Sequence, residues 1–402
     1  MDIETKPVQL RRIKKEFFDG THRVISPEKT YEMVNPLMEI LRVPEIIDVT
    51  EYERLGIPVF GVPRPGAARG GKKIHWGKGK EELHAKVSAM MEAVERYSAE
   101  YRGSPLLLSG YEMLGLRKAI DPHSLYLPRR LEVGEEIHWS AAWDILNDEP
   151  VYVPSNAIYH PYDPMGMAQQ LFRSDTNGIA SGNVLEEAIL HAILEVVERD
   201  AISVAEWQRS MGRRLTITQD GPAKKVLDQF TDAGIDIHLW LLDGKTGIPT
   251  VAAASDDTLT KDPGMLVMGS GSHLNPEIAA LRALNEVAQS RASELYMRDQ
   301  KEMADNDPRV QILAKAGYDR MKRINGMWFK EAESIDLSEI PDISTEYIDE
   351  DIRICLEEIG EHAERVCVYT FSRTEIPVVR VVIPGFEVSY MDPSRRSGLA
   401  AK

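Results

Sequence analysis

The sequence predicts a mixed α/β fold, because predicted helices and strands alternate along the chain. Residues 81–101 contain strong helix formers throughout and no proline or glycine, which predicts a long helix. Further helices are predicted over 185–208, 276–297 and 347–364. Short apolar runs predict strands, which cover residues 46–50, 57–60, 151–153, 237–242, 250–254, 366–371 and 377–383.

Composition narrows the class of protein. The 402 residues include 64 Asp and Glu against 48 Lys and Arg, a formal net charge of -16. A nucleic-acid partner is therefore not expected, since phosphates are bound by basic faces. The two cysteines, Cys355 and Cys367, are too few for a disulfide framework or a four-thiolate zinc site. No signal peptide is visible at the start, and no uncharged apolar stretch approaches the roughly 18 residues that span a membrane. We expect a cytoplasmic protein.

The chain contains an internal repeat. Residues 92–96 (Glu-Ala-Val-Glu-Arg) and 195–199 (Glu-Val-Val-Glu-Arg) are near copies, and each lies the same distance after a glycine, Gly79 or Gly182. A weaker third copy, residues 286–289 (Glu-Val-Ala-Gln), follows the glycine-rich stretch 269–273. The repeated unit is a predicted glycine-rich loop followed by an acid-bearing helix.

The two acids of each copy are three residues apart, so they share one helix face. Apolar residues bracket them, for example Met90, Met91, Ile193 and Leu194, which predicts buried helices. Buried carboxylates need a partner. One interpretation is a set of structural ion pairs with the neighbouring arginines. The other is a Mg²⁺ site that takes hard oxygen ligands, with phosphates held by the glycine loops.

A second glycine-rich stretch, residues 66–73, nearly matches the Walker A pattern. Lys73 stands where the Mg²⁺-binding Ser or Thr of that pattern belongs, and no strong strand and helix flank the stretch. We do not expect a phosphate loop here.

From about Gly20 to Glu387 the sequence resembles the YcaO family of ATP-dependent enzymes that modify the peptide backbone. The matching blocks are residues 20–23 with Pro27 and Thr30, 48–50, 55–59 with 64–65, 77–79 with 88–96, 177–199, Gly271 and His273 with 286–291, 377–379 and 384–385. Their order and number carry the resemblance.

The resemblance implies that ATP and Mg²⁺ are the cofactors, and it assigns site residues. The implied ATP contacts are Arg23, Thr30, Lys78, Ser88, Glu95, Arg96, Asn183, Glu187 and Gln289. The implied metal ligands are Glu92, Glu95, Glu187, Glu195, Glu198 and Glu286. The implied catalytic residues are Glu195, Glu198, Arg199 and Arg291.

The same resemblance implies four parts of the chain. Residues 1–76 form the amino-terminal part of the YcaO-like unit, and 77–300 form the central part that binds ATP and Mg²⁺. The acidic, polar residues 301–345 are expected to be a connector, and 346–402 a carboxy-terminal α/β part. A basic helix is expected at the start of the chain, over residues 11–15, with a solvated face.

The implied reaction is ATP-dependent phosphorylation of a backbone amide oxygen while a nucleophile adds to the carbon. A neighbouring Cys, Ser or Thr gives an azoline; sulfide or a sulfur carrier gives a thioamide. The tail, residues 391–402, has a single proline, and no leader-binding domain or helical-repeat extension is visible, which favours the stand-alone thioamide-forming members. Those modify a glycine of the methyl-coenzyme M reductase α subunit, often with a TfuA partner. We also expect a homodimer.

Two alternatives stay open at this point: an azoline-forming cyclodehydratase acting on a ribosomal peptide, and a non-catalytic ATP-binding accessory protein. Of the remaining candidates, His191 is expected to be a hydrogen-bonded core histidine, and His273 is the histidine to test as a catalytic base. Asp200 is expected to orient Arg199 or to have no specific role. Acids 349–351 are expected to begin a helix rather than to bind metal.

Overall fold

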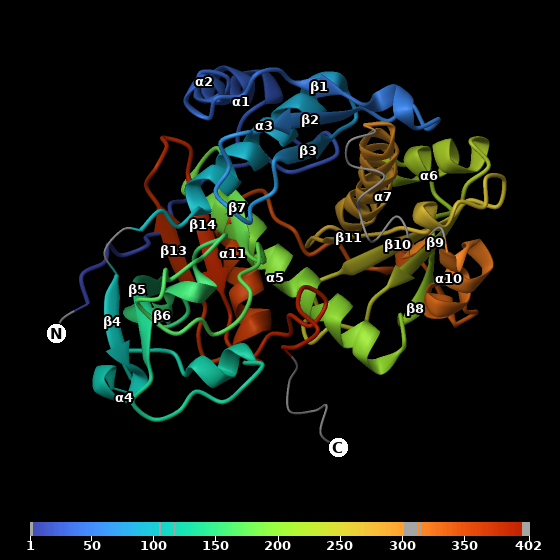
Figure 1. Ribbon diagram of the computed structural model, residues 1–402. Coiled ribbons are helices and arrows are strands. Elements are labelled where there is room, and N and C mark those ends of the chain that lie inside the picture. Colours follow the sequence, from blue (N-terminus) through green and yellow to red (C-terminus); the bar gives the residue numbers. More distant parts are fainter. Residues whose placement is uncertain (1–2, 104–105, 116, 301–311, 314, 396–402) are drawn as a thin grey trace.

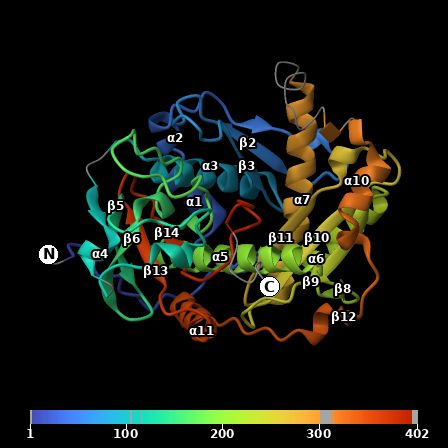
Figure 2. The same ribbon diagram turned by 60° about the horizontal axis from the view of Figure 1, so that its bottom comes forward.

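The computed structural model describes residues 3–103, 106–115, 117–300, 312–313 and 315–395. The strands of this part form three sheets. A small antiparallel sheet has the order β1-β2-β3, a second has the order β11-β10-β9-β8-β12, and the largest has the order β4-β5-β13-β14-β7 with β6 paired to β5. Figures 1 and 2 show the long helix α5 (Leu185–Gln208) lying between the two larger sheets, with α3 and the small sheet over one end.

The other helices are α1 (Pro27–Val34), α2 (Leu37–Ile40), α3 (Glu82–Ala99), α4 (Tyr111–Leu114), α6 (Pro222–Asp232), α7 (Pro276–Asp299), α10 (Tyr318–Ile324) and α11 (Ile348–Gly360). The strands are β1 (Ile47–Asp48), β2 (Val59–Pro63), β3 (Ile74–Lys78), β4 (Leu107–Gly110), β5 (Glu136–Asp144), β6 (Glu149–Pro154), β7 (Ile179–Ser181), β8 (Arg213–Thr216), β9 (Asp236–Leu241), β10 (Thr250–Asp256), β11 (Met268–Ser272), β12 (Ser334–Asp336), β13 (Cys367–Phe371) and β14 (Val378–Val382). The predicted mixed α/β class and the long helices are confirmed. None of the helices in the described part is long and apolar enough to cross a membrane.

The glycines of the repeat have a packing role. Lys78 and Gly77 belong to β3, residues 179–181 to β7 and residues 268–272 to β11, so the predicted glycine loops are largely strands. Each strand precedes a long helix that packs on it. A Cβ at Gly77 would lie 2.1 Å from the amide nitrogen of Ala89 in α3, and one at Gly269 would lie 2.4 Å from the carbonyl oxygen of Ala283 in α7. The prediction that Gly77 and Gly269 lie in loops is therefore wrong: they lie in strands and permit close contact between helix and strand.

The amino-terminal residues 11–15 do not form the predicted helix. They are extended, and Lys14 pairs with Tyr347 as an isolated β-bridge. Arg11 contacts Glu186 of α5 at 2.8 Å, and the fully buried Lys15 contacts Asp351 of α11 at 2.6 Å. The basic side chains thus attach this segment to two helices, because buried charges require partners. Acids 349–351 lie in the first turn of α11, which confirms that prediction.

Part of the predicted connector is ordered into the fold. Residues 318–324 form α10, and β12 adds a parallel edge strand to β8. Residues 301–311 and 314 lie outside the described residues. The expected boundary at residue 76 falls inside β3. Cys355 and Cys367 are both buried, and Cys367 packs in strand β13 as predicted.

Replacing Gly77 with Ala tests the packing role of the repeat glycines. The added methyl group collides with the backbone of α3, so Gly77→Ala should lower the free energy of unfolding by about 3 kcal/mol. Gly326→Ala is the matched control, because a Cβ there meets nothing within 4 Å. Urea unfolding followed by circular dichroism measures both. Equal effects at the two positions would show that the close approach at Gly77 is not a constraint.

Candidate functional site

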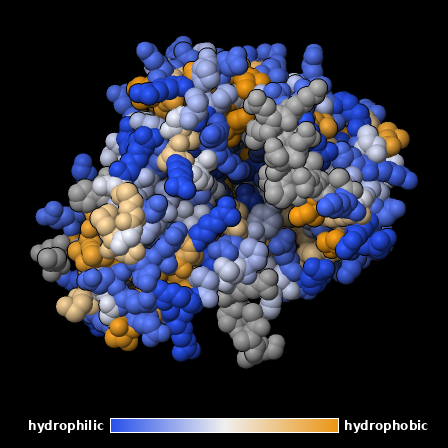
Figure 3. All heavy atoms as spheres, in the orientation of Figure 1, coloured by the Kyte–Doolittle hydropathy of each residue, from blue (hydrophilic) through white to orange (hydrophobic). Residues whose placement is uncertain are grey.

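The acids of the three repeats project from α3, α5 and α7 into the region where these helices meet. Figure 3 shows that the face seen in Figure 1 is hollowed at its centre, where hydrophilic side chains gather. The structure brings five predicted acids and two predicted arginines close together, because the charge of each acts on the pKa of others in the group. The acids are Glu92, Glu95, Glu195, Glu198 and Glu286, and the arginines are Arg96 and Arg199.

The first repeat is attached to strand β7. One carboxylate oxygen of Glu95 accepts a hydrogen bond from the backbone N–H of Ser181 at 2.9 Å, and the other lies 3.0 Å from Arg96. Arg96 also lies 3.8 Å from Glu92. Burial raises the pKa of Glu95 to about 8; Arg96 opposes this shift, and the charges of Glu195 and Glu92 add to it.

Acids of the second and third repeats accept hydrogen bonds from serines of strand β11. Glu286 accepts from the backbone N–H of Ser270 at 2.8 Å, and Glu198 accepts from the Ser270 hydroxyl at 2.8 Å and from the N–H of Ser272 at 3.2 Å. Arg199 lies 3.4 Å from Glu198 and 3.9 Å from Glu286. Although burial opposes it, the carboxylates around Arg199 raise its pKa above the ordinary value, so it stays charged.

Glu195 differs from these acids. Its carboxylate makes no hydrogen bond or ion pair with any residue that the structure describes, while its neighbours Arg96 and Arg199 act on it only at longer range. Burial raises its pKa, the two arginines counter that shift, and Glu198 adds to it. An acid in this state gains from a cation that brings its own ligands.

The donor set fits Mg²⁺ that arrives with phosphate. Across the described ranges no three carboxylate, imidazole or thiol side chains already stand together as a metal cluster. Instead, Arg96 and Arg199 separate the acids into small groups. Mg²⁺ is commonly bound through one or two carboxylates together with substrate phosphates and water, which suits oxygen donors in this arrangement. The residues present therefore fit a magnesium–nucleotide ligand, with Glu195 as the carboxylate that lacks a partner.

Glu187, a predicted metal ligand and ATP contact, is held by hydrogen bonds. Its Oε1 accepts from the N–H of Val24 at 2.6 Å, and its Oε2 accepts from the backbone and side-chain nitrogens of Asn183 at 2.8 and 2.9 Å. The Thr30 hydroxyl donates to Oδ1 of Asn183 at 2.9 Å. Both oxygens of Glu187 are occupied, which favours a positioning role: Glu187 holds the predicted ATP contacts Asn183 and Thr30 against the amino-terminal segment.

A group of cations lies beside this network. Arg23, Lys78 and Arg282 all lower the pKa of His191, together with burial as the largest cause. Within the described residues none of the three has a carboxylate within 4 Å. Arg23 donates to the carbonyl of His22, and Arg282 lies 3.1 Å from Nε2 of His191. The prediction that His191 is hydrogen-bonded is confirmed, but the residue is half-buried beside these cations rather than part of the apolar core. Unpaired cations of this kind suit the phosphates of a nucleotide.

The sequence analysis missed Arg282. Its position four residues before Glu286 places both side chains on one face of α7, and this spacing is the signal that could have revealed it.

Four predicted residues form no hydrogen bond or ion pair with the acid group in the described part of the chain. Arg291 is fully buried, and its nitrogens contact Glu53 at 2.7 Å, Asp257 at 2.8 Å and the carbonyl of Met265. These partners already compensate the guanidinium group of Arg291, as a buried charge requires. The prediction of Arg291 as a catalytic residue is corrected accordingly. Ser88 and Gln289 are half-buried on α3 and α7 and make no hydrogen bond with the described residues. His273 accepts from the N–H of Asn275 and packs against His22, apart from the acids.

The carboxy-terminal residues return to the site. Asp200 accepts from Lys245 and from the N–H of Glu387, so it holds this segment rather than orienting Arg199 as expected. The Tyr390 ring centroid lies 5.7 Å from the Arg199 guanidinium carbon.

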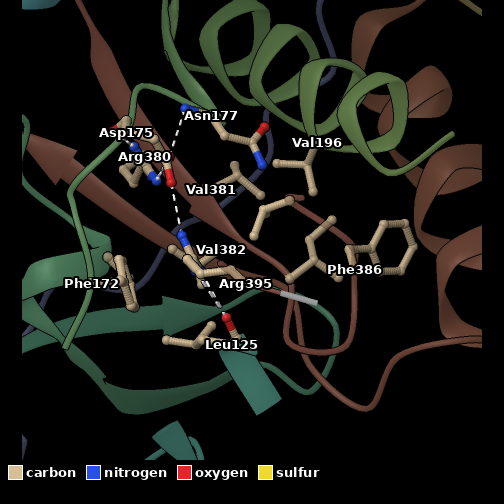
Figure 4. Close-up of a pocket in the computed structure, with 13 residues that line it drawn as sticks. Leu125, Phe172, Asp175, Asn177, Val196, Arg380, Val381, Val382, Phe386 and Arg395 are labelled. Atoms are coloured by element: carbon tan, nitrogen blue, oxygen red, sulfur yellow. Dashed lines mark hydrogen bonds and ion pairs between the residues drawn. The ribbon is translucent and has the colours of Figure 1, made fainter. Parts of the chain in front are cut away.

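Figure 4 shows the pocket below α5 where Arg380 and Arg395 meet. Asp175 bridges them at 2.9 and 2.8 Å. Tyr390 and Arg395 carry no sequence signal, and the predicted tail beyond residue 395 lies outside the described residues.

The raised pKa of Glu95 predicts how stability depends on pH in the protein without nucleotide. In the unfolded chain this acid titrates near 4.5, and in the folded protein near 8. Between these values the folded state binds more protons than the unfolded state, so stability falls as pH rises, by about 1.4 kcal/mol per pH unit from this group. Glu95→Gln should remove that contribution. Urea unfolding between pH 5 and pH 9 measures it, at roughly one-unit intervals.

The exposed Glu357 on α11 provides the control, since Glu357→Gln should retain the wild-type dependence. An unchanged slope in Glu95→Gln would contradict the buried, proton-binding state of Glu95.

The chain is similar to known proteins over most of its length. A family model described as YcaO cyclodehydratase, ATP- and Mg²⁺-binding, matches residues 76–387. The chain is 41% identical over 382 residues to an uncharacterized protein of Methanothermobacter thermautotrophicus, which covers 93% of this chain and 97% of the relative. It is 29% identical over 428 residues to an uncharacterized protein encoded in the tfuA 3′ region of Rhizobium leguminosarum bv. trifolii, which covers 100% and 97%.

Two solved structures extend the comparison. The YcaO protein of Methanopyrus kandleri, bound with AMPPCP and Mg²⁺, matches with a TM-score of 0.77 and 26% identity over 95% of this chain and 97% of that chain. A heterocyclase in complex with substrate and cofactor matches with a TM-score of 0.79 and 23% identity over 95% of this chain but 54% of that chain, a likeness of fold.

The family model covers most of the chain, and its description names the two cofactors that the sequence predicts. Together with the solved YcaO structure that contains an ATP analogue and Mg²⁺, this confirms ATP and Mg²⁺ as the cofactors. The chain therefore belongs to the YcaO family of ATP-dependent enzymes.

Proposed function

We propose that this protein uses Mg²⁺-ATP to activate a peptide backbone amide and installs a thioamide on a glycine of a protein substrate, such as the methyl-coenzyme M reductase α subunit. Sulfide or a sulfur carrier is the nucleophile. The observation that carries the proposal is the group of buried and half-buried acids and arginines on α3, α5 and α7, with the partnerless carboxylate of Glu195 among them.

The proposed reaction balances. HS⁻ adds to the carbonyl carbon, and the carbonyl oxygen takes the γ-phosphoryl group of ATP. The carbon–oxygen bond then breaks, so the oxygen leaves within phosphate, which also receives the proton of HS⁻. A carbon–sulfur double bond remains. Bound Mg²⁺ neutralises phosphate charge in such transfers.

The chain's own residues have separate tasks in this proposal. Arg199 and Arg96 lie among the acids and stabilise negative charge that develops on the transferred group. Lys78, Arg23 and Arg282 supply cations for the remaining phosphates. Glu198 and Glu286 are held by the serine N–H groups of β11, which fixes their orientation before any ligand binds.

The thioamide is proposed over the azoline because of the resemblance to the thioamide-forming members of the family. The M. kandleri YcaO matches over 95% of this chain and 97% of its own length, and the heterocyclase over 95% and 54%. A relative encoded beside tfuA is consistent with a TfuA-type partner.

The second candidate is an azoline-forming cyclodehydratase. The family description names cyclodehydratase, and the heterocyclase shares the fold, so the same site would also serve a Cys, Ser or Thr nucleophile.

Mass spectrometry distinguishes the two products. A glycine-containing peptide of the substrate protein is incubated with the enzyme, Mg²⁺-ATP and sulfide, with and without a TfuA-type protein. The proposal predicts ATP-dependent exchange of one oxygen for sulfur. Glu195→Gln should lower the rate by about 100-fold or more, because it removes the charge that faces the metal. Glu357→Gln, on the exposed face of α11, should react like the wild type.

Loss of water without sulfur uptake would replace the thioamide with the azoline assignment. Wild-type turnover in Glu195→Gln would remove Glu195 from the metal site. ATP binding with no product and no peptide-stimulated turnover in either reaction mixture would assign the accessory role instead.

A further inference from the structure

A second cavity adjoins the outer edge of the acid group, on the side of α3. It encloses about 390 Å³ of empty space, part of it open to solvent. The charged and titratable side chains that line it are Arg64, Lys72, Glu92, Arg96, Glu100 and His160. Glu92 and Arg96 also belong to the proposed nucleotide and metal site, so the two spaces share one wall.

Arg64 is the buried anchor of this cavity. The residue is 1% exposed. Its Nη2 donates to Glu100 at 2.6 Å, and its Nη1 lies 3.4 Å from Nε2 of His75. Its Nε is buried and has no hydrogen-bond partner. A buried donor without an acceptor costs free energy, so an acceptor supplied by a ligand would be favourable here.

The charges around the cavity leave an excess of positive charge. Glu100 is already compensated by Arg102, at 3.1 Å from its Nε, and by the N–H of Ala68 at 3.0 Å. The charge of Arg64 is therefore not cancelled by Glu100 alone. Lys72 is exposed and makes no ion pair with the described residues. An anion in this space would meet guanidinium and ammonium donors, which bind anions more strongly than neutral donors do.

Two further lining groups, Glu92 and His160, also affect the net charge of the cavity. Glu92 contributes a negative charge on the shared wall, but it lies 3.8 Å from Arg96 and 3.9 Å from His75. His160 contributes none at neutral pH, because burial and the nearby Arg96 lower its pKa to about 4. The remaining cations of the lining are Arg64 and Lys72, and Lys72 also lies within electrostatic range of Glu92.

The loop that supplies Lys72 is the stretch resembling Walker A. It joins β2 to β3 as a hairpin, and no helix follows it directly, so it lacks the strand–loop–helix setting of a Walker A motif. The backbone N–H of Arg64 donates to the carbonyl of Lys73 at 2.7 Å, and Glu100 fixes Ala68. The loop is therefore held in place from α3, with Lys72 at the mouth of the cavity.

We propose that this cavity is a subsite for a small anion, bound by Arg64, Lys72 and Arg96 next to the nucleotide and metal site. The proposal rests on the proposed function, whose reaction includes two small anions: the hydrosulfide that attacks the amide and the phosphate that leaves. Both share the chemistry of a compact anion that accepts hydrogen bonds from cations. The cavity supplies that chemistry beside Glu92 and Arg96, where either anion would have direct access to the reacting groups.

Isothermal titration calorimetry of the full-length protein tests the subsite without turnover. Sodium hydrosulfide under anaerobic conditions is one probe, and inorganic phosphate is the other. Each is titrated with and without saturating Mg²⁺ and a non-hydrolysable ATP analogue. We expect at least one anion to bind in both conditions, and Lys72→Gln to weaken it about tenfold or more. Lys73→Gln is the matched control, because Lys73 is the exposed neighbour that does not line the cavity.

Hydrosulfide binding that depends on Lys72 would assign the subsite to the nucleophile, and phosphate binding alone with the same dependence would assign it to the product. Three results would overturn the proposal: no binding of either anion, equal effects of the two lysine variants, or complete loss of binding with the ATP analogue, which would make the cavity part of the nucleotide site. Because binding is measured directly, a failure of thioamide formation in the peptide assay leaves this result standing.

Discussion

The structure depends on the burial of several carboxylates among three helices. Glycines in β3 and β11 allow α3 and α7 to pack directly on these strands, which brings the acids to the serines of β7 and β11. Each acid except Glu195 then has an N–H, a hydroxyl or an arginine as partner. Burying charged groups in this way costs free energy unless their partners are in place. The glycines, the serines and the two arginines are therefore all needed for this arrangement of acids.

The same arrangement of acids and arginines also explains how the site is expected to bind metal and nucleotide. Arg96 and Arg199 hold the acids apart, so a divalent cation is not bound by a ready-made cluster but needs additional oxygens from a ligand. A triphosphate would supply them, and the cations Arg23, Lys78 and Arg282, which all act on His191, would offset its charge. Nucleotide and metal are thus expected to bind together. The carboxy-terminal segment, held by Asp200 and Asp175, places Tyr390 over Arg199 and closes this region.

The sequence predicts what is local and repeated. The three long helices, their acids and Arg96 and Arg199 follow from composition and spacing, and the structure brings them together. Interactions across the chain were not predictable. Residues 11–15 have a helix-like composition, but Arg11 pairs with Glu186 and Lys15 with Asp351, which lie far away in sequence. Arg291 matches a family block, yet its partners Glu53 and Asp257 occupy it. The spacing of the repeat glycines predicts loops, because spacing alone does not distinguish a turn from a close contact between strand and helix.

Metal binding measured by electron paramagnetic resonance tests the central claim most directly. Mn²⁺ replaces Mg²⁺ and is titrated into the protein with and without AMPPCP, in the wild type and in Glu195→Gln. The account predicts that the wild type binds Mn²⁺ tightly only when the nucleotide is present, and that Glu195→Gln weakens this binding while its circular dichroism spectrum stays native. Tight Mn²⁺ binding without nucleotide, or equal binding in the two proteins, would contradict it.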